Sequence, residues 1–366
     1  MTPADGSLAA LREAVRDAMG ESDLNDAPLP SPTPSNGQSN TQWRTAVEHA
    51  RTLADARAVR HREIVDRVSS ELFGTTVADL LPPVGPLGRR VVHVSTPPDP
   101  QLADVLPDTL HRTLPRGPGA RVPEHRTSIR VSVTEPADPR AVIIRLHGGA
   151  FWMAGGVAAD RIDARLIEQL AHVAQAVVLN VDYRLAPEHP FPAAIVDTLS
   201  VLDAVRHASL GLPNPGAPIA LVGTSSGANI ATVAAMADAA RRPASALSAL
   251  GLIVPSVLLA RVPSGARAVG DRKRQLRGYL GDLPLDAPWA SPAVRSTLPG
   301  MPRTFAAIAT ADEIAVGGEQ LCAAIEAGGG VATARHYEMT HTTAPPAVES
   351  ALILDLAAAM RDALRG

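Results

Sequence analysis

The chain has 366 residues, of which 46% are hydrophobic and 19% are charged, and its formal net charge is -3 at pH 7. This length allows one large domain or two to three small ones, and the composition excludes a chain that is disordered throughout. The slightly negative charge argues against a nucleic-acid partner, which needs a basic surface. The single cysteine, Cys322, excludes an intramolecular disulfide and a cysteine-based zinc site.

The first helix is expected near the N-terminus. Residues 7–19 have an amphipathic pattern that ends at Gly20, and residues 25–41 are rich in Pro, Ser and Asn, which predicts a linker. We therefore expect residues 1–42 to form a flexible N-terminal extension. Residues 1–20 lack the apolar core of a secretory signal, so a cytoplasmic protein is expected.

A longer helical segment follows. Apolar residues recur with helical spacing over residues 43–80, and prolines then end the pattern. Residues 85–125 show no clear period, so residues 43–125 are taken together as a helical region and a lead-in. The longest apolar stretch of the chain, residues 246–260, is interrupted by Ser and Pro, so we expect no membrane span.

From residue 126 onward the pattern is that of an α/β domain, which we extend to residue 366. Strands are expected at 127–134, 141–147, 176–182, 218–223, 250–255, 304–309 and 331–338, and helices at 160–174, 192–208, 226–241, 317–327 and 346–364. The alternation predicts a mostly parallel, doubly wound sheet flanked by helices. Residues 256–299 are long for one connection and should carry helices of their own that shape a pocket.

A candidate nucleophile lies between the fourth of these strands and the helix that follows it. Residues 223–227 read GTSSG, which matches G-x-S-x-G in its required strand–turn–helix context. The tight turn needs small neighbours, and Gly223 and Gly227 supply them. Ser225 is at the centre of the motif. Ser226 is a second candidate for the nucleophile, although its backbone N–H is placed to donate to an oxyanion. The alternative interpretation of the whole motif is an ordinary Gly/Ser turn without a catalytic role.

A second glycine-rich turn ends the strand at 141–147. It reads HGGA, and small residues there let the backbone N–H groups of Gly148, Gly149 and Ala150 approach a substrate oxygen. A simple chain reversal is the alternative. His147 is expected to order this loop rather than to act as the catalytic base.

Three motifs together resemble the hormone-sensitive-lipase branch of the α/β-hydrolase esterases: HGGAF (147–151), DYRLAPEHPFPAA (182–194) and GTSSGAN (223–229). The resemblance covers about residues 125–365. It implies the α/β-hydrolase fold and a cofactor-free, metal-free serine hydrolase of short acyl esters. It also implies a helical cap contributed partly by residues 43–80. The loop at 183–188 is expected to buttress the oxyanion strand.

The resemblance and the chain order Ser, acid, His assign the rest of the triad. Asp312 follows an apolar strand and aligns with the acid of the family, although Glu313 stands where the family has proline and is a rival. His341 follows the last strand, on a loop, and is the expected base. His336 lies inside that strand and is expected to be structural.

Few aromatic side chains are available to line a substrate pocket, since the chain has 3 Trp, 3 Tyr and 4 Phe. Phe151 and Trp152 follow the oxyanion loop, and Trp289 lies in the long connection, so these three are the predicted pocket residues. Ordinary core packing is the alternative for each of them.

The predicted function is therefore cleavage of short-chain carboxylic esters through a covalent acyl-enzyme. An amide or formamide hydrolase and a deacetylase of a secondary metabolite stay open, because they use the same groups. A ligand-binding relative without activity, such as the gibberellin receptors, is disfavoured because Ser225, Asp312 and His341 are all present. The expected partner is a small-molecule ester. The oligomeric state is open, with a homodimer as one option.

Overall fold

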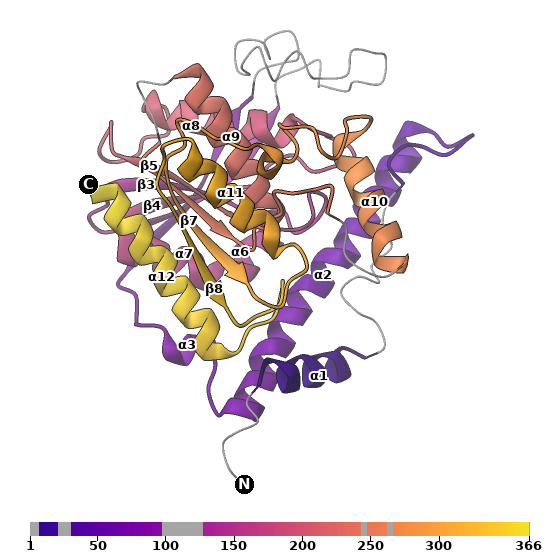
Figure 1. Ribbon diagram of the computed structural model, residues 1–366, viewed down its shortest axis with the longest axis horizontal. Coiled ribbons are helices and arrows are strands. Elements are labelled where there is room, and N and C mark those ends of the chain that lie inside the picture. The colour runs from indigo at the N-terminus through magenta and orange to yellow at the C-terminus, as the bar shows by residue number, and fades with distance from the viewer. Residues whose placement is uncertain (1–6, 21–30, 97–126, 243–246, 262–265, 366) are drawn as a thin grey trace.

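An eight-stranded sheet forms the centre of the computed structural model, which describes residues 7–20, 31–96, 127–242, 247–261 and 266–365 (Figure 1). The strand order is β1-β2-β4-β3-β5-β6-β7-β8. The pairs β1–β2 and β2–β4 are antiparallel, and all the other pairs are parallel. The strands are β1 (Leu87–Ser95), β2 (Ser128–Pro136), β3 (Ala141–Leu146), β4 (Ala176–Val181), β5 (Ile219–Thr224), β6 (Ala249–Ile253), β7 (Arg303–Ala309) and β8 (Ala332–Tyr337).

Helices cover both faces of this sheet. The helices of the described residues are α1 (Leu8–Met19), α2 (Asn40–Phe73), α3 (Val77–Leu80), α6 (Gly156–Ile162), α7 (Ala164–Ala174), α8 (Ala193–Arg206), α9 (Ser226–Arg241), α10 (Ala266–Leu280), α11 (Ala315–Ala327) and α12 (Pro346–Arg365). One core cluster joins the sheet to α8, α9 and α11, and a second joins its other face to α7 and α12. Every residue of β3 and β4 is buried, as expected of parallel strands covered on both faces.

This architecture confirms the predicted fold class, and each of the seven predicted strands overlaps one of β2 to β8. The prediction missed β1, an edge strand within the stretch that had no clear period. Most of its residues are exposed, so the hydrophobic alternation that marks a half-buried strand is absent there. The helix predicted at 160–174 is two helices, α6 and α7, which meet at Asp163.

The N-terminal helix corrects the expectation of a flexible extension. Leu11 and Val15 of α1 are buried against Ile64, Val65 and Val68 of α2, so α1 is packed on the structure rather than free. The helix α2 also begins within the expected extension, at Asn40, with a capping box at Ser39. The predicted linker is described only from residue 31.

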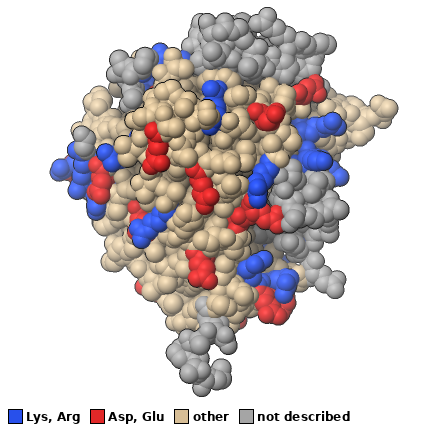
Figure 2. Space-filling view, in the orientation of Figure 1, with Lys and Arg blue, Asp and Glu red and all other residues tan. Residues whose placement is uncertain are grey.

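The long connection between β6 and β7 carries α10 and a 3₁₀ turn (Pro292–Val294), as expected. In Figure 1, α10 lies near the N-terminal end of α2. On the face drawn in Figure 2, acidic and basic side chains are interspersed over a largely uncharged surface.

Candidate active site

Ser225 occupies a sharp turn between β5 and α9. Its backbone has φ 54° and ψ −114°, a strained conformation that exposes the side chain at the end of the strand. The neighbouring glycines make the turn possible. A Cβ on Gly223 would lie 2.3 Å from the carbonyl oxygen of Gly227, and a Cβ on Gly227 would lie 2.2 Å from that of Leu146. Both glycines of the predicted motif are therefore required by close backbone approach.

The structure brings the three predicted triad residues together. Ser225 Oγ lies 2.7 Å from His341 Nε2, and His341 Nδ1 lies 2.6 Å from Asp312 Oδ2. The other carboxylate oxygen of Asp312 accepts a hydrogen bond of 3.2 Å from the backbone N–H of Ile314, and only 8% of the Asp312 side chain is exposed. The carboxylate is thus held in one orientation beneath the imidazole.

The rival residues lie elsewhere. Glu313 is exposed, and it is the adjacent Asp312 that reaches the imidazole. His336 lies within β8, as predicted, but it is half exposed, and its Nε2 lies 2.9 Å from Glu319 Oε1. His336 therefore lies in the strand, as expected, but its side chain is not packed into the core as a structural role within a strand would suggest. The outer residues of β8 face solvent because this strand ends the sheet.

The predicted oxyanion loop lies against the nucleophile turn. A Cβ on Gly148 would be 3.6 Å from Ser225 Cβ, and Gly149 adopts φ 123°, where its own Cβ would lie 2.0 Å from the carbonyl oxygen of Met153. In the described parts of the chain, the backbone N–H groups of Gly149 and Ala150 have no hydrogen-bond acceptor. The N–H of Ser226 points from the first turn of α9, whose dipole favours negative charge.

The loop at 183–188 does buttress this turn. The Tyr183 hydroxyl donates a 2.8 Å hydrogen bond to the carbonyl oxygen of His147, and the two rings stack with centroids 4.3 Å apart. Burial lowers the pKa of His147, which favours the neutral ring. His147 Nδ1 lies 2.6 Å from the carbonyl oxygen of Gly148, so His147 orders the loop and does not face the triad.

A buried arginine joins the oxyanion strand to the nucleophile turn. Arg145 lies on β3, and its Nη2 donates to Thr224 Oγ1 at 2.7 Å and to Asp163 Oδ2 at 2.9 Å. Thr224 directly precedes Ser225. Position 145 shows no motif signal in the sequence, because its role depends on the register between β3 and β5.

The long helix α2 binds the outer side of the oxyanion loop. The sequence did not indicate which residues of α2 make these contacts. Arg51 Nε donates to the carbonyl oxygen of Trp152 at 2.7 Å, and the rest of its guanidinium binds Glu188 Oε2 at 2.6 Å and the carbonyl oxygen of Ala186 at 3.1 Å. Asp55 Oδ1 accepts a 2.6 Å hydrogen bond from the backbone N–H of Ala154. One helix thus contacts both loops that flank the candidate site.

The predicted pocket aromatics are all buried and have protein partners. Phe151 stacks on Tyr279 of α10 with centroids 3.8 Å apart, and Trp152 packs against Ala50 and Ala54 of α2. Trp289 lies in the main core cluster. These contacts place the first two between the loop and the overlying helices. Contact of Phe151, Trp152 or Trp289 with substrate stays a prediction.

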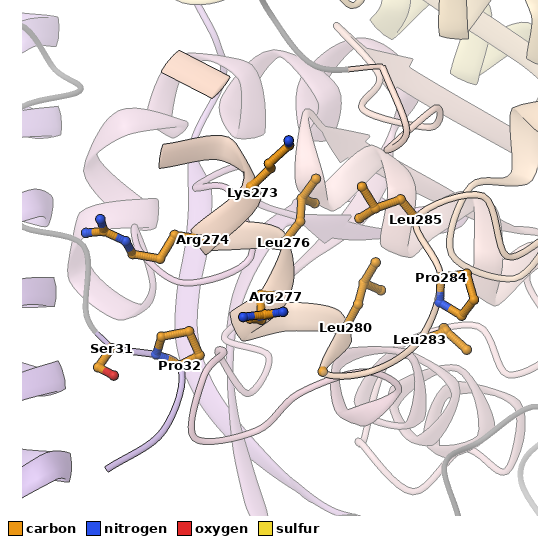
Figure 3. A pocket seen from close by; sticks show the side chains of 11 residues that line it. Ser31, Pro32, Lys273, Arg274, Leu276, Arg277, Leu280, Leu283, Pro284 and Leu285 are labelled. Atoms are coloured by element: carbon orange, nitrogen blue, oxygen red, sulfur yellow. The ribbon is translucent and has the colours of Figure 1, made fainter. Parts of the chain in front are cut away.

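A cavity of about 830 Å³ lies beside α10 and does not include the triad. Figure 3 shows Ser31 and Pro32 on the same side of the cavity as Arg274, with Leu280, Leu283 and Leu285 on the other side; Lys273 and Arg277 also line it. Within the described ranges, no three His, Cys, Asp or Glu side chains are grouped to hold a metal ion. None of the described helices has both the length and the apolar composition needed to cross a membrane.

Comparisons with known proteins identify the family of this chain. A family model for the alpha/beta hydrolase fold matches residues 143–344. A 120-residue segment is 42% identical to carboxylesterase NlhH of Mycobacterium tuberculosis and covers 31% of this chain and 35% of that protein. An arylesterase of Saccharolobus solfataricus is 27% identical over 54% of this chain and 66% of its own length. The chain therefore spans less than two thirds of these curated relatives.

Two more distant comparisons differ in extent, since a solved structure matches nearly the whole chain and a curated relative matches about a third of it. An esterase structure from Pyrobaculum calidifontis has a TM-score of 0.66 at 22% identity and covers 96% of this chain and 97% of that one. Bovine hormone-sensitive lipase is 28% identical over 37% of this chain and 16% of its own length. With the family model covering more than half of the chain, this protein belongs to the α/β-hydrolase fold family, in the branch that includes hormone-sensitive lipase.

Proposed function

We propose that this protein is a serine hydrolase that cleaves short-chain carboxylic esters through a covalent acyl-enzyme. The observation that carries the proposal is the hydrogen-bonded series from Asp312 through His341 to Ser225, at a strained strand–helix turn. Names of relatives such as carboxylesterase and arylesterase support the ester as the substrate class.

The first half-reaction forms the acyl-enzyme. His341 Nε2 takes the proton of Ser225 Oγ as that oxygen attacks the ester carbonyl carbon. The carbonyl oxygen becomes an oxyanion that accepts hydrogen bonds from the N–H groups of Gly149, Ala150 and Ser226. The C–O bond to the alcohol then breaks, and the imidazolium returns its proton to the leaving alkoxide.

The second half-reaction releases the acid. Water attacks the acyl carbon while His341 takes its proton, and the same N–H groups hold the second oxyanion. The bond to Ser225 Oγ breaks, and the proton returns to Ser225. Asp312 fixes the imidazole orientation and stabilises its charged form in both steps.

A hydrolysis panel tests this proposal. The purified protein should release 4-nitrophenol from 4-nitrophenyl acetate and butyrate with saturation kinetics, and much less 4-nitroaniline from the matching anilides. Ser225→Ala should remove turnover while leaving the folded state intact. Faster cleavage of the anilides would favour an amide hydrolase instead, and ester turnover that survives in Ser225→Ala would overturn the mechanism.

A further inference from the structure

An arginine of α10 lies close to the candidate nucleophile. Arg272 Nη2 donates a 2.7 Å hydrogen bond to Ser256 Oγ, and the backbone N–H of Ser256 donates a 3.2 Å hydrogen bond to the carbonyl oxygen of Ser225. The Ser256 carbonyl oxygen is fixed in turn by Asn229 Nδ2 at 3.0 Å. Ser256 therefore links the Arg272 guanidinium to the backbone of Ser225 through two hydrogen bonds.

The charge of Arg272 has no anionic partner in the described parts of the chain. Arg272 Nε is buried and has no hydrogen-bond acceptor there. Among the described residues, Asp312 is the one carboxylate close enough to affect it electrostatically, but that carboxylate is engaged with His341 and the backbone N–H of Ile314. Burial lowers the pKa of Arg272 to about 10, so the group remains charged at neutral pH.

Two other buried arginines of this chain are each paired with a carboxylate. Arg145 is paired with Asp163 at 2.9 Å, and Arg184 with Asp197 at 2.5 Å. A guanidinium removed from water without a partner is costly, because its hydration is lost and no Coulomb attraction replaces it. Arg272 thus differs from these two arginines because it forms no ion pair with a described residue, although its charge lies close enough to Asp312 of the triad to interact with it.

We propose that Arg272 binds an anionic group of the substrate, so that the site prefers esters carrying a second, ionised acid group a few bonds from the ester. This inference rests on the proposed ester hydrolysis and defines its substrate class. A guanidinium is suited to the role because its planar fork binds a carboxylate through two parallel hydrogen bonds. Ser256 accepts a hydrogen bond from Nη2, and no hydrogen bond within the described parts of the chain occupies Nη1, so the outer edge of the guanidinium can bind the ligand.

Two matched pairs of esters test the preference. Monoethyl succinate is compared with neutral ethyl levulinate, which probes an acid group on the acyl side. 4-Acetoxybenzoate is compared with neutral 4-acetoxyacetophenone, which probes the alcohol side. The wild-type protein should favour the anionic member of one pair by about 10–100-fold in kcat/KM, the range of a charge-assisted bidentate contact.

Arg272→Gln should remove that preference by raising KM for the anionic ester, with little change for its neutral partner. Arg272→Lys should keep part of the preference, because the charge stays and the fork is lost. The control is Arg274→Gln, which removes a charge from the wall of the neighbouring cavity and should leave the preference intact.

Ser256→Ala provides a second, milder variant that frees the guanidinium without removing it and should weaken the preference. Equal loss of both esters in folded Arg272→Gln, seen as a fall in kcat, would overturn the inference and make Arg272 a residue that acts on the triad. No preference in either pair would also overturn it. Ser225-dependent hydrolysis of 4-nitrophenyl butyrate would still support the proposed function in both cases.

Discussion

The three side chains of the candidate triad are arranged through their backbone surroundings as much as through each other. Ser225 is fixed by a strained turn between two glycines, Asp312 by a backbone N–H, and His341 by the loop that follows β8. Ser225 was predictable because G-x-S-x-G is a local motif, whereas Asp312 and His341 were assigned from the family resemblance and the chain order. The geometry between them was not predictable, because it depends on where β5, β7 and β8 end in one sheet.

The base can be separated from its rival by mutation. His341→Ala should lower kcat by several orders of magnitude, because Ser225 loses its proton acceptor and only oxyanion stabilisation and binding remain. His336→Ala should change kcat little and stability by less than about 1 kcal/mol, because its contact with Glu319 is solvent-exposed. Steady-state kinetics on 4-nitrophenyl butyrate check both. Loss of turnover in His336→Ala alone would reverse the assignment.

His189 should make folding stability depend on pH. Burial, followed by the nearby charge of Arg184, lowers the pKa of His189 to about 4, whereas an unfolded histidine titrates near about 6.5. Between these values the unfolded chain binds the proton and the folded chain does not. The stability contributed by neutral His189 is therefore full above about pH 6.5 and is lost as the pH falls toward 4.

Urea unfolding at pH 7.5 and pH 5 measures this contribution. Protonation of His189 in the unfolded chain should lower the free energy of unfolding by about 1–2 kcal/mol when the pH falls from 7.5 to 5. His189→Gln should reduce the difference. An undiminished difference in His189→Gln would assign the pH dependence to other groups, among them buried His147.

At the scale of elements, α2 acts as a brace for the loops around the site. Arg51 makes four hydrogen bonds to two loops, and Asp55 holds the backbone of Ala154. The sequence predicted a helix here and, by resemblance, a cap. It did not single out Arg51 or Asp55, because the contacts join positions more than ninety residues apart and no local pattern encodes them.

Arg51→Gln should therefore lower kcat by about 10–100-fold at temperatures where the variant is fully folded, because small displacements of reacting groups are costly in rate. KM should change less, and Arg51→Lys should recover part of the loss. The control is Arg67→Gln, which breaks an exposed ion pair with Glu71 on the same helix and should be nearly neutral. A melting-temperature loss with unchanged kcat would reduce Arg51 to a purely structural role.

At the scale of the whole molecule, the secondary structure of the α/β domain could be predicted from the sequence. The elements before residue 126 were predicted less well. Buried parallel strands produce apolar runs that stand out, and the predicted helix at 226–241 matches α9 at both ends. Exposed β1 produces no such run. The packing of α1 was hidden because its partner face on α2 lies beyond a Pro- and Ser-rich segment that reads as a flexible linker.

Deletions at the N-terminus test the roles of these parts. Removing residues 1–20 should lower the melting temperature, because Ile64, Val65 and Val68 lose their cover, but should retain most ester hydrolysis. Removing residues 1–80 should abolish activity, because Arg51 and Asp55 go with them. Full activity after the longer deletion would contradict a bracing role for α2.

The central claim is that Ser225 is the nucleophile of this molecule. The most direct measurement is mapping of the covalent adduct after treatment with a fluorophosphonate, by intact mass and then by peptide sequencing. We predict one phosphonyl group per chain, on Ser225, with parallel loss of ester hydrolysis, and no adduct in Ser225→Ala. Ser226→Ala should still be labelled, because its side chain is buried beneath the turn. An adduct on Ser226, or inactivation without an adduct on Ser225, would contradict the claim.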